Sequence, residues 1–353
     1  MPLPPIAATD LQEILQATAP LWEGVREELR GQRIFITGGT GFFGSWLVES
    51  FLHINNALGL NAHATVLTRH PEAFLDKSPH LRRQPALTLV PGDVRNFTFP
   101  AEPHAFVIHA ATEASARQIA DQPHQMLSTI LAGTERTLTF AAHTGARKML
   151  LTSSGAVYGP QPAQLSHMPE EFTGAPDPLI PASVYGEGKR AAELMCALAA
   201  RPGFDIKIAR CYAFIGPHLP LDTHFAAGNF LRDALKGNTI AIASDGTTVR
   251  SYLYASDLAI WLWTMLFQAP SLRAYNVGSE DAISVRGLAE TIVKTVNPQS
   301  KVQVSQTPAA GVHPNRYIPA TARAQTELGL AQKVSLEEGL RRTAAWHRTT
   351  QLF

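Results

Sequence analysis

The stretch Ile34-Phe35-Ile36-Thr37-Gly38-Gly39-Thr40-Gly41-Phe42-Phe43-Gly44 predicts the fold of this chain. Its first residues are typical of a buried parallel strand, and the residues after Phe43 are typical of a helix. Gly38, Gly41 and Gly44 have the spacing G-x-x-G-x-x-G. Glycine lets the backbone turn tightly and approach a pyrophosphate, and the N–H groups that start a helix bind phosphates. The stretch therefore predicts the strand, turn and helix of a dinucleotide-binding unit.

Short apolar strands and helices continue to alternate beyond this unit. Helices are predicted over Gly44–Ala57, Met126–Thr144 and Val184–Ala200. The predicted strands are Arg33–Thr37, Ala64–Thr68, Leu87–Pro91, Ala105–His109, Lys148–Thr152 and Ile206–Arg210. This alternation predicts the α/β class, with a Rossmann-type doubly wound parallel sheet.

The pattern divides the chain into three parts. Residues 1–30 have a helix-like apolar spacing and are expected to form a helical N-terminal extension. Residues 31–216 are expected to form the dinucleotide-binding domain, with 255–280 returning to it. The rhythm changes after Pro217, so 217–254 and 281–353 are expected to form a smaller C-terminal substrate-binding lobe over the carboxyl edge of the sheet, where such folds bind ligands.

Composition narrows the class of protein. The chain has 353 residues, of which 45% are hydrophobic, so it can bury a large core. A formal net charge of +1 gives no sign of nucleic-acid binding. Two cysteines fit a reducing cytoplasm, and the apolar run 260–267 is too short to span a membrane. We expect a cytoplasmic protein without a metal site and without a nucleic-acid or membrane partner.

Several residues near the ends of the strands are expected to contact the cofactor. Arg69 follows the second strand, where the adenosine ribose lies; an arginine there suits the 2′-phosphate of NADP, or it stacks on the adenine or faces water. Asp93 either accepts from the adenine amino group or is a turn aspartate. The predicted NAD(P)-binding residues are Gly38, Thr40, Gly41, Phe42, Phe43, Gly44, Arg69, Asp93, Val94, Ala110, Ala111, Thr112, Tyr185 and Lys189. NADP is favoured slightly over NAD.

A serine, a tyrosine and a lysine form a candidate proton-transfer set. Tyr185 and Lys189 are four residues apart and share one face of a predicted helix. The phenol titrates near ~10, and a neighbouring ammonium is expected to lower that pKa. Ser154 follows a strand and can hold the reacting oxygen for Tyr185, while Lys189 can also reach the nicotinamide ribose. Such pairs also occur by chance on helix surfaces, but here the glycine-rich turn and the serine strand accompany the pair.

Taken together, these motifs resemble those of the extended short-chain dehydrogenase/reductase family, the nucleotide-sugar epimerases and dehydratases. The resemblance covers about residue 32 to the C-terminus, and its marks include 37–44, Ser154 with Tyr158, Tyr185-x-x-x-Lys189, 210–217, 250–258 and 275–278. It implies a nucleoside diphosphate sugar as substrate and a homodimer packed through helices that include the one bearing Tyr185. The residues that it implies for substrate binding are Glu113, Ser154, Asn229, Arg250 and Arg316. Arg250 would pair with the diphosphate, a role that suits a guanidinium group.

Two departures from the family pattern bear on the reaction. Dehydratases of this family usually carry Asp-Glu after the catalytic Ser or Thr, and decarboxylating relatives often carry Glu in the second place; here Gly155 and Ala156 stand there. Ala213 stands where many relatives have a substrate-binding asparagine. The small residues Gly155 and Ala156 resemble those that C4 epimerases and 4-keto reductases carry at these positions. The leading hypothesis is an epimerase acting at sugar C4; a reductase, a dehydratase that uses Glu113, and a non-catalytic dinucleotide sensor are the alternatives.

Overall fold

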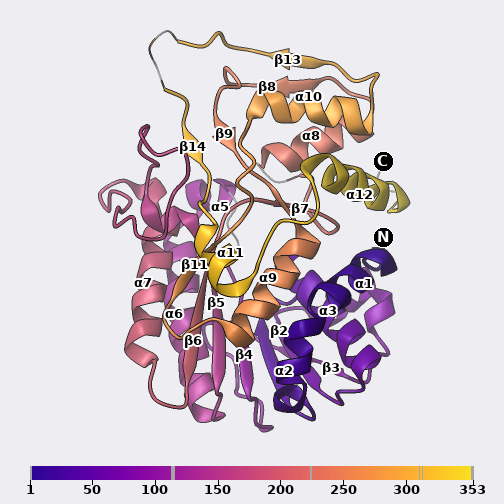
Figure 1. Cartoon of the computed structure of the whole chain (residues 1–353), viewed down its shortest axis with the longest axis vertical. Coiled ribbons are helices and arrows are strands. Elements are labelled where there is room, and N and C mark those ends of the chain that lie inside the picture. Colours follow the sequence, from indigo (N-terminus) through magenta and orange to yellow (C-terminus); the bar gives the residue numbers. More distant parts are fainter. Residues whose placement is uncertain (1, 113–115, 223–224, 310, 312, 351–353) are drawn as a thin grey trace.

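The computed structural model describes residues 2–112, 116–222, 225–309, 311 and 313–350. Its centre is a seven-stranded sheet in which every neighbouring pair is parallel, in the order β11-β6-β5-β4-β1-β2-β3. The strands are β1 (Arg33–Thr37), β2 (His63–Thr68), β3 (Leu87–Pro91), β4 (Phe106–His109), β5 (Lys148–Ser154), β6 (Asp205–Cys211) and β11 (Ala274–Val277). The predicted doubly wound sheet is confirmed, and all six predicted strands are present to within two residues at each end (Figure 1).

Helices cover both faces of the sheet because the strand side chains alternate between two apolar layers. On β1, Ile34 and Ile36 belong to one buried cluster and Phe35 to the other. The Phe35 face packs against α6 (Pro123–His143) and α7 (Val184–Ala199). The opposite face carries α3 (Phe42–Leu58) and α9 (Ala255–Gln268). The short helix α5 (Ala116–Asp121) packs on α6.

The seventh strand comes from far along the chain. Helix α9 is buried along almost its whole length and leads to β11, which pairs with β6 in the register Asn276↔Arg210. The run 260–267 is therefore the interior of a core helix. No helix in the described part of the chain is long and apolar enough to cross a membrane.

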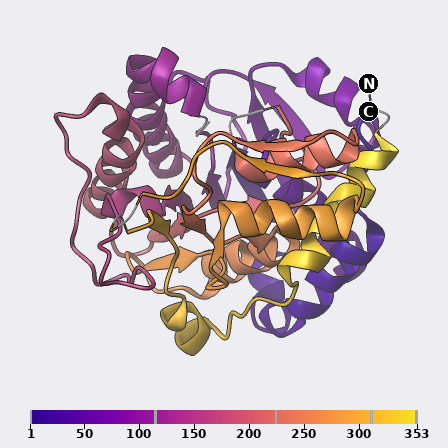
Figure 2. The same ribbon diagram turned by 90° about the horizontal axis from the view of Figure 1, so that it is seen from above.

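A smaller lobe lies over the carboxyl ends of the strands (Figures 1 and 2). Its helices are α8 (Ala226–Leu235), α10 (Val285–Val296) and α12 (Leu336–Thr349), whereas α11 (Ala322–Leu328) packs on β11 and α9 beside the sheet. Its strands pair as β8 (Ile240–Ile242) with β13 (Val302–Val304), and as β9 (Val249–Arg250) with β12 (Ile283–Ser284) and β14 (Arg316–Tyr317). A short pair, β7 (Phe214–Ile215) and β10 (Leu253–Tyr254), connects the lobe to the sheet region.

The first residues form two helices, α1 (Ala8–Ala17) and α2 (Ala19–Leu29), that pack on α3 and α9. Asp10 is buried and accepts hydrogen bonds from Tyr254 at 2.8 Å and from Arg342 of α12 at 2.6 Å. Glu49 of α3 is also buried; it accepts from the Ile6 backbone N–H at 2.8 Å. These contacts bring the two ends of the chain together, as Figures 1 and 2 show.

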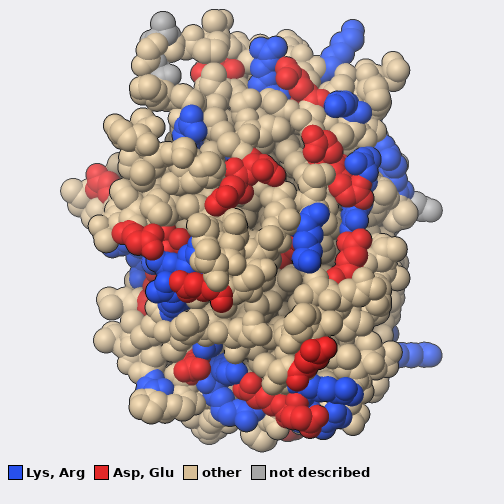
Figure 3. Space-filling view, in the orientation of Figure 1, with Lys and Arg blue, Asp and Glu red and all other residues tan. Residues whose placement is uncertain are grey.

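The surface carries charges of both signs. On the face shown in Figure 3, lysine and arginine side chains are interspersed with aspartate and glutamate side chains, and no large area has a single sign. This distribution is consistent with the nearly balanced composition of 30 basic and 29 acidic residues.

Candidate active site

The glycine-rich turn between β1 and α3 has the geometry of a phosphate-binding loop. Gly38 has φ +71°, and a Cβ atom there would lie 2.3 Å from the Ala110 carbonyl oxygen. A Cβ at Gly44 would lie 2.3 Å from Gly39, so packing within the protein itself requires both of these glycines. Gly41 differs, since its φ is −88° and a Cβ there would meet only the Gly38 oxygen at 3.5 Å. Packing does not require glycine at position 41, whereas close approach of a pyrophosphate does.

The start of α3 is also suited to an anion. No side chain caps its N-terminus, so its first backbone N–H groups are available to a phosphate. The predicted residues Thr40, Phe42 and Phe43 lie at this turn, and Phe43 packs edge-on against Phe214 at 5.0 Å. The turn thus fits a dinucleotide on geometric grounds.

At the adenosine end, Arg69 follows β2 and is exposed. Asp93 pairs with Arg95, whose Nε and Nη2 donate to its two oxygens at 2.8 and 2.9 Å, and this interaction lowers the Asp93 pKa. Asp93 therefore already accepts from Arg95. Val94 is buried against Gly133 of α6 rather than open to a ligand.

The end of β4 forms the floor of the site. His109 is buried, with Nδ1 2.7 Å from Thr37 Oγ1 and Nε2 3.2 Å from Thr134 Oγ1, and burial lowers its pKa to about 3. It is therefore a packed histidine and not a catalytic one. The backbone of Ala110 and Ala111 runs directly against Gly38.

Ser154, Tyr185 and Lys189 come together at the carboxyl ends of β5 and β6. Ser154 ends β5, opposite Cys211 in the register, and its hydrogen bond to Tyr185 lowers the phenol pKa. Burial nevertheless dominates and raises the pKa of Tyr185 to about 12. The Lys189 ammonium lies 5.9 Å from the centre of the Tyr185 ring. The expectation that the Tyr185 pKa is lowered is wrong for this structure, because burial raises it and the interaction that lowers it is the Ser154 hydrogen bond rather than the ammonium.

Lys189 is itself strongly affected by its surroundings. Its side chain is 3% exposed, and its Nζ donates to the Thr152 carbonyl at 2.7 Å and to Thr112 Oγ1 at 3.2 Å. Burial lowers its pKa to about 8. In the described part of the chain, no carboxylate lies within ion-pair distance of this ammonium. The structure brings Thr112 and Lys189 together, both of which were predicted to contact the cofactor.

Two tyrosines complete the site, and the sequence motifs did not identify either of them. The Tyr317 hydroxyl lies 3.3 Å from Ser154 Oγ and donates to the Cys211 carbonyl at 3.4 Å. Its ring packs on Tyr212, with 4.4 Å between centroids and 34° between planes. Tyr317 directly follows Arg316, and this adjacency was the only signal in the sequence for its importance.

The ring of Tyr212 also explains Gly155. A Cβ atom at position 155 would lie 2.5 Å from Tyr212 Cζ, so a side chain and this ring cannot occupy the same space. The tyrosine ring therefore fills the place beside Ser154 that an acidic side chain would need. Glu113, the substitute acid considered above, lies outside the described residues.

Of the predicted substrate-binding residues, Arg250 lies nearest to this group. It pairs in register with Tyr317, and its guanidinium lies 5.7 Å from that ring. Its recorded hydrogen bonds are to the Val249 carbonyl and Asn315 Oδ1, and burial lowers its pKa. No carboxylate in the described segments forms an ion pair with it.

The other two candidates are less directly placed. Successive side chains of a strand point to opposite faces, so Arg316 points away from the side that Tyr317 occupies. Asn229 lies in α8, where its Oδ1 accepts from Arg232 at 3.4 Å. The structure thus groups Arg250 with Tyr317 and Ser154, and shows no such contact for Arg316 or Asn229.

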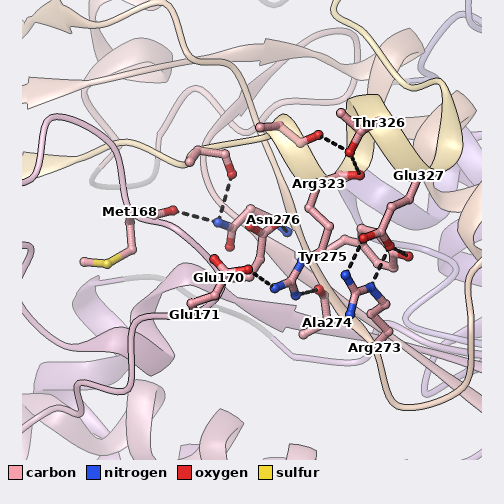
Figure 4. Close-up of polar contacts among 12 residues, drawn as sticks. Met168, Glu170, Glu171, Arg273, Ala274, Tyr275, Asn276, Arg323, Thr326 and Glu327 are labelled. Atoms are coloured by element: carbon pink, nitrogen blue, oxygen red, sulfur yellow. Dashed lines mark hydrogen bonds and ion pairs between the residues drawn. The ribbon is translucent and has the colours of Figure 1, made fainter.

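A buried polar network joins the lobe to the sheet behind the site (Figure 4). Asn276 Nδ2 donates to the carbonyls of Met168 at 2.8 Å and Ala320 at 3.0 Å. Its Oδ1 accepts from Tyr158 at 2.9 Å, and Arg210 donates to the same Tyr158 oxygen at 2.9 Å. Asn276 therefore fixes the segment that follows Tyr317 against the central sheet.

Comparisons with known proteins agree with this geometry. The profile of the NAD dependent epimerase/dehydratase family matches residues 34–278. UDP-glucuronic acid decarboxylases 5 and 3 of Arabidopsis thaliana are 31% and 32% identical over 318 residues; the alignments cover 87% of this chain and 87% and 86% of theirs. The UDP-glucose 4-epimerase of Thermotoga maritima, solved with UDP-glucose, superposes with a TM-score of 0.74 at 22% identity, covering 90% of this chain and 99% of its own. The dTDP-glucose 4,6-dehydratase of Bacillus anthracis, solved with NAD, has a TM-score of 0.71 at 18% identity, with 91% and 97% covered. The chain therefore belongs to the NAD-dependent epimerase/dehydratase family, enzymes of the extended short-chain dehydrogenase/reductase type that act on nucleotide sugars.

Proposed function

We propose that this enzyme is a nucleotide-sugar epimerase that works by transient oxidation at sugar C4. Tyr185 takes the proton of the sugar hydroxyl, Ser154 holds the reacting oxygen, and Lys189 supports Tyr185 and anchors the cofactor ribose. A bound nicotinamide would supply the redox chemistry, as the acceptor of the C4 hydride and its donor to the other face of the sugar. In the structure Tyr185 carries its proton, since its pKa is about 12. We propose that binding of substrate and cofactor lowers this pKa so that Tyr185 can act as the base.

The observation that carries this proposal is the pairing of Gly155 with Tyr212. Dehydratases of this family usually carry acidic side chains directly after the catalytic serine or threonine, and decarboxylating relatives often carry a glutamate there. Here Gly155 and Ala156 have no acid, and the Tyr212 ring fills the space at position 155. Epimerisation needs one proton-transfer group, which the observed set supplies, and a hydride acceptor, which a bound nicotinamide would supply. The two Arabidopsis relatives are decarboxylases. Their likeness does not decide the reaction of this chain, because Gly155 and Ala156 stand where decarboxylating relatives often carry a glutamate.

The same reasoning suggests how the ligands are held. We propose that 38–44 cradle the pyrophosphate of NAD(P), that Arg69 favours NADP by pairing with its 2′-phosphate, and that Arg250 pairs with the diphosphate of the sugar nucleotide. Arg250 has no carboxylate partner among the residues that the structure describes, and this supports an anionic ligand there. Asn229, Arg316 and Glu113 remain candidates for further substrate contacts. In this proposal 31–216 with 255–280 bind the cofactor, and 217–254 with 281–353 bind the substrate.

A reductase of nucleotide 4-keto sugars is the second candidate. Arg69 favours it, because NADPH is the usual source of hydride for a net reduction and this exposed arginine follows β2, where we expect the adenosine ribose and its 2′-phosphate to lie. The residues of the proton-transfer set would be the same, with Tyr185 donating its proton to the keto oxygen instead of accepting one.

We also propose that the enzyme is a homodimer packed through α6 and α7. Leu194 and Leu198 of α7 are 61% and 80% exposed, which is unusual for leucines four residues apart on one helix face. They would be covered if α7 packed against the same helices of a second copy.

The reaction is tested by incubating the purified enzyme with UDP-, dTDP-, GDP- and CDP-sugars and analysing products by mass spectrometry and proton NMR. A product of unchanged mass with an inverted C4 supports the epimerase. Turnover of a 4-keto sugar only with NADPH would make it a reductase, and loss of water or carbon dioxide would refute both. Tyr185→Phe is the matched variant, because it removes one oxygen and should abolish turnover.

A further inference from the structure

The reacting serine is bordered by an aromatic wall that belongs partly to the smaller lobe. Tyr212 follows β6 and Tyr317 lies in β14, yet their rings are in contact at 4.4 Å. Tyr212 is held from two sides: Gly155 borders the end of its ring, and a Cβ at Gly278 would lie 3.1 Å from its own Cβ. This wall occupies the place beside Ser154 where dehydratases that this chain resembles usually carry an acidic side chain.

The two hydroxyl groups of this wall are available to a ligand in different ways. The Tyr317 hydroxyl lies 3.3 Å from Ser154 Oγ and donates its proton to the Cys211 carbonyl at 3.4 Å, so it would accept from a sugar hydroxyl or turn its proton from that carbonyl towards the sugar. The Tyr212 hydroxyl is buried and has no hydrogen-bond partner among the described residues. Burial raises the pKa of both phenols, so both are neutral and can donate a hydrogen bond at neutral pH.

Tyr317 is held in place by the backbone on its C-terminal side. Ile318 N–H donates to Gln161 Oε1 at 3.0 Å, and its carbonyl accepts from Met168 N–H at 2.8 Å. The Ala320 carbonyl accepts a hydrogen bond from Asn276 Nδ2 at 3.0 Å. The tyrosine is therefore a rigid part of the site and not a mobile surface residue.

From these contacts we infer that Tyr317 binds the reacting sugar together with Ser154, and that the Tyr212–Tyr317 pair selects nucleotide sugars that place an uncharged substituent against its rings. The inference rests on the proposed function, because it places the sugar at Ser154. A hydroxymethyl or methyl group packs well against two phenol rings. A carboxylate there would lose its hydration without gaining a cationic partner. Arg250 is proposed to pair with the diphosphate, and the Lys189 ammonium lies over the ring of Tyr185.

The test measures binding by isothermal titration calorimetry, separately from turnover. Wild type, Tyr317→Phe and a control, Tyr275→Phe, are titrated with UDP, UDP-glucose and UDP-glucuronic acid in the presence of cofactor. The control removes a hydroxyl that bonds to Glu327 in the network of Figure 4, away from Ser154. If UDP does not bind, the corresponding dTDP, GDP and CDP compounds replace it.

In wild type we expect UDP-glucose to bind at least about tenfold more tightly than UDP-glucuronic acid. Tyr317→Phe should weaken UDP-glucose about 3- to 10-fold and leave UDP unchanged, because one hydrogen bond to the sugar is lost. The inference is overturned if Tyr317→Phe binds UDP-glucose as wild type does, if UDP-glucuronic acid binds equally well, or if no sugar nucleotide binds. The expected binding pattern without epimerisation would refute the proposed reaction and leave the role of Tyr317 standing.

Discussion

Replacing Lys189 with methionine should stabilise the ligand-free protein at neutral pH while abolishing its activity. Burial lowers the Lys189 pKa from 10.5 to about 8. At about 1.36 kcal/mol per pKa unit, holding the proton on this buried group costs about 3 kcal/mol of folding free energy at pH 7. Lys189→Met removes that cost but leaves the Thr152 carbonyl without its donor, which costs about 1–2 kcal/mol. The variant should therefore be about 1–2 kcal/mol more stable than wild type at pH 7.

The pH dependence of this difference is the sharper test. Between pH 8 and 10.5 the unfolded chain keeps the proton on Lys189 and the folded chain has lost it, so wild-type stability rises with pH. The methionine variant lacks this group, and its advantage should shrink by about 3 kcal/mol and reverse by pH 10.5. Urea unfolding at pH 7, 8, 9 and 10.5 measures both proteins under the same conditions, so other titrating groups cancel in the difference.

An exposed lysine provides the control. Lys294 of α10 is exposed, and Lys294→Met should show a stability difference that does not change with pH. The reasoning is refuted if Lys189→Met is less stable than wild type by the same amount at pH 7 and pH 10.5. That result would mean that the ammonium is well solvated and that the site does not keep Lys189 at a cost to stability.

Three further predictions concern other parts of the structure. Gly41→Ala should lower the free energy of unfolding by no more than about 1 kcal/mol, because a Cβ atom has room there. The same variant should bind the cofactor at least about tenfold more weakly by calorimetry. Binding equal to that of wild type would mean that the pyrophosphate does not lie against Gly41. Leu198→Arg should convert a dimer to a folded monomer in size-exclusion chromatography with light scattering, and an unchanged mass would exclude α7 from the interface. Tyr212→Phe deletes a buried hydroxyl without a partner, so urea unfolding should show stability unchanged or up to about 1 kcal/mol higher; a loss of about 2 kcal/mol or more would reveal a hidden partner.

Local patterns predicted the parts of the fold that depend on neighbouring residues. The first strand, the glycine turn and the helix follow from residues 34–44, and the common face of Tyr185 and Lys189 follows from helical spacing. Parallel strands alternating with helices then leave few possible topologies. Spacing does not determine how deeply a side chain is buried, however. The Tyr185 pKa was predicted wrongly for this reason, because burial raises it.

The parts that could not be predicted depend on contacts across long separations. Tyr317 reaches Ser154 across 163 positions of sequence, through a lobe whose strands are only two or three residues long. Nothing in the residues around Tyr212 indicates that its ring fills the space above Gly155. Short strands carry little periodicity, so the register that sets Tyr317 beside Arg250 is visible only in the folded structure.

The most direct test of the central claim follows the hydrogen at the reacting carbon. A nucleotide sugar that the enzyme accepts is labelled with deuterium at C4 and incubated with enzyme and cofactor in ordinary water, and the product is analysed by NMR and mass spectrometry. Transient oxidation at C4 predicts a product of unchanged mass, with inverted configuration and with the deuterium still on C4. A product that has lost water or carbon dioxide, or one with the deuterium replaced by solvent hydrogen, would contradict the account.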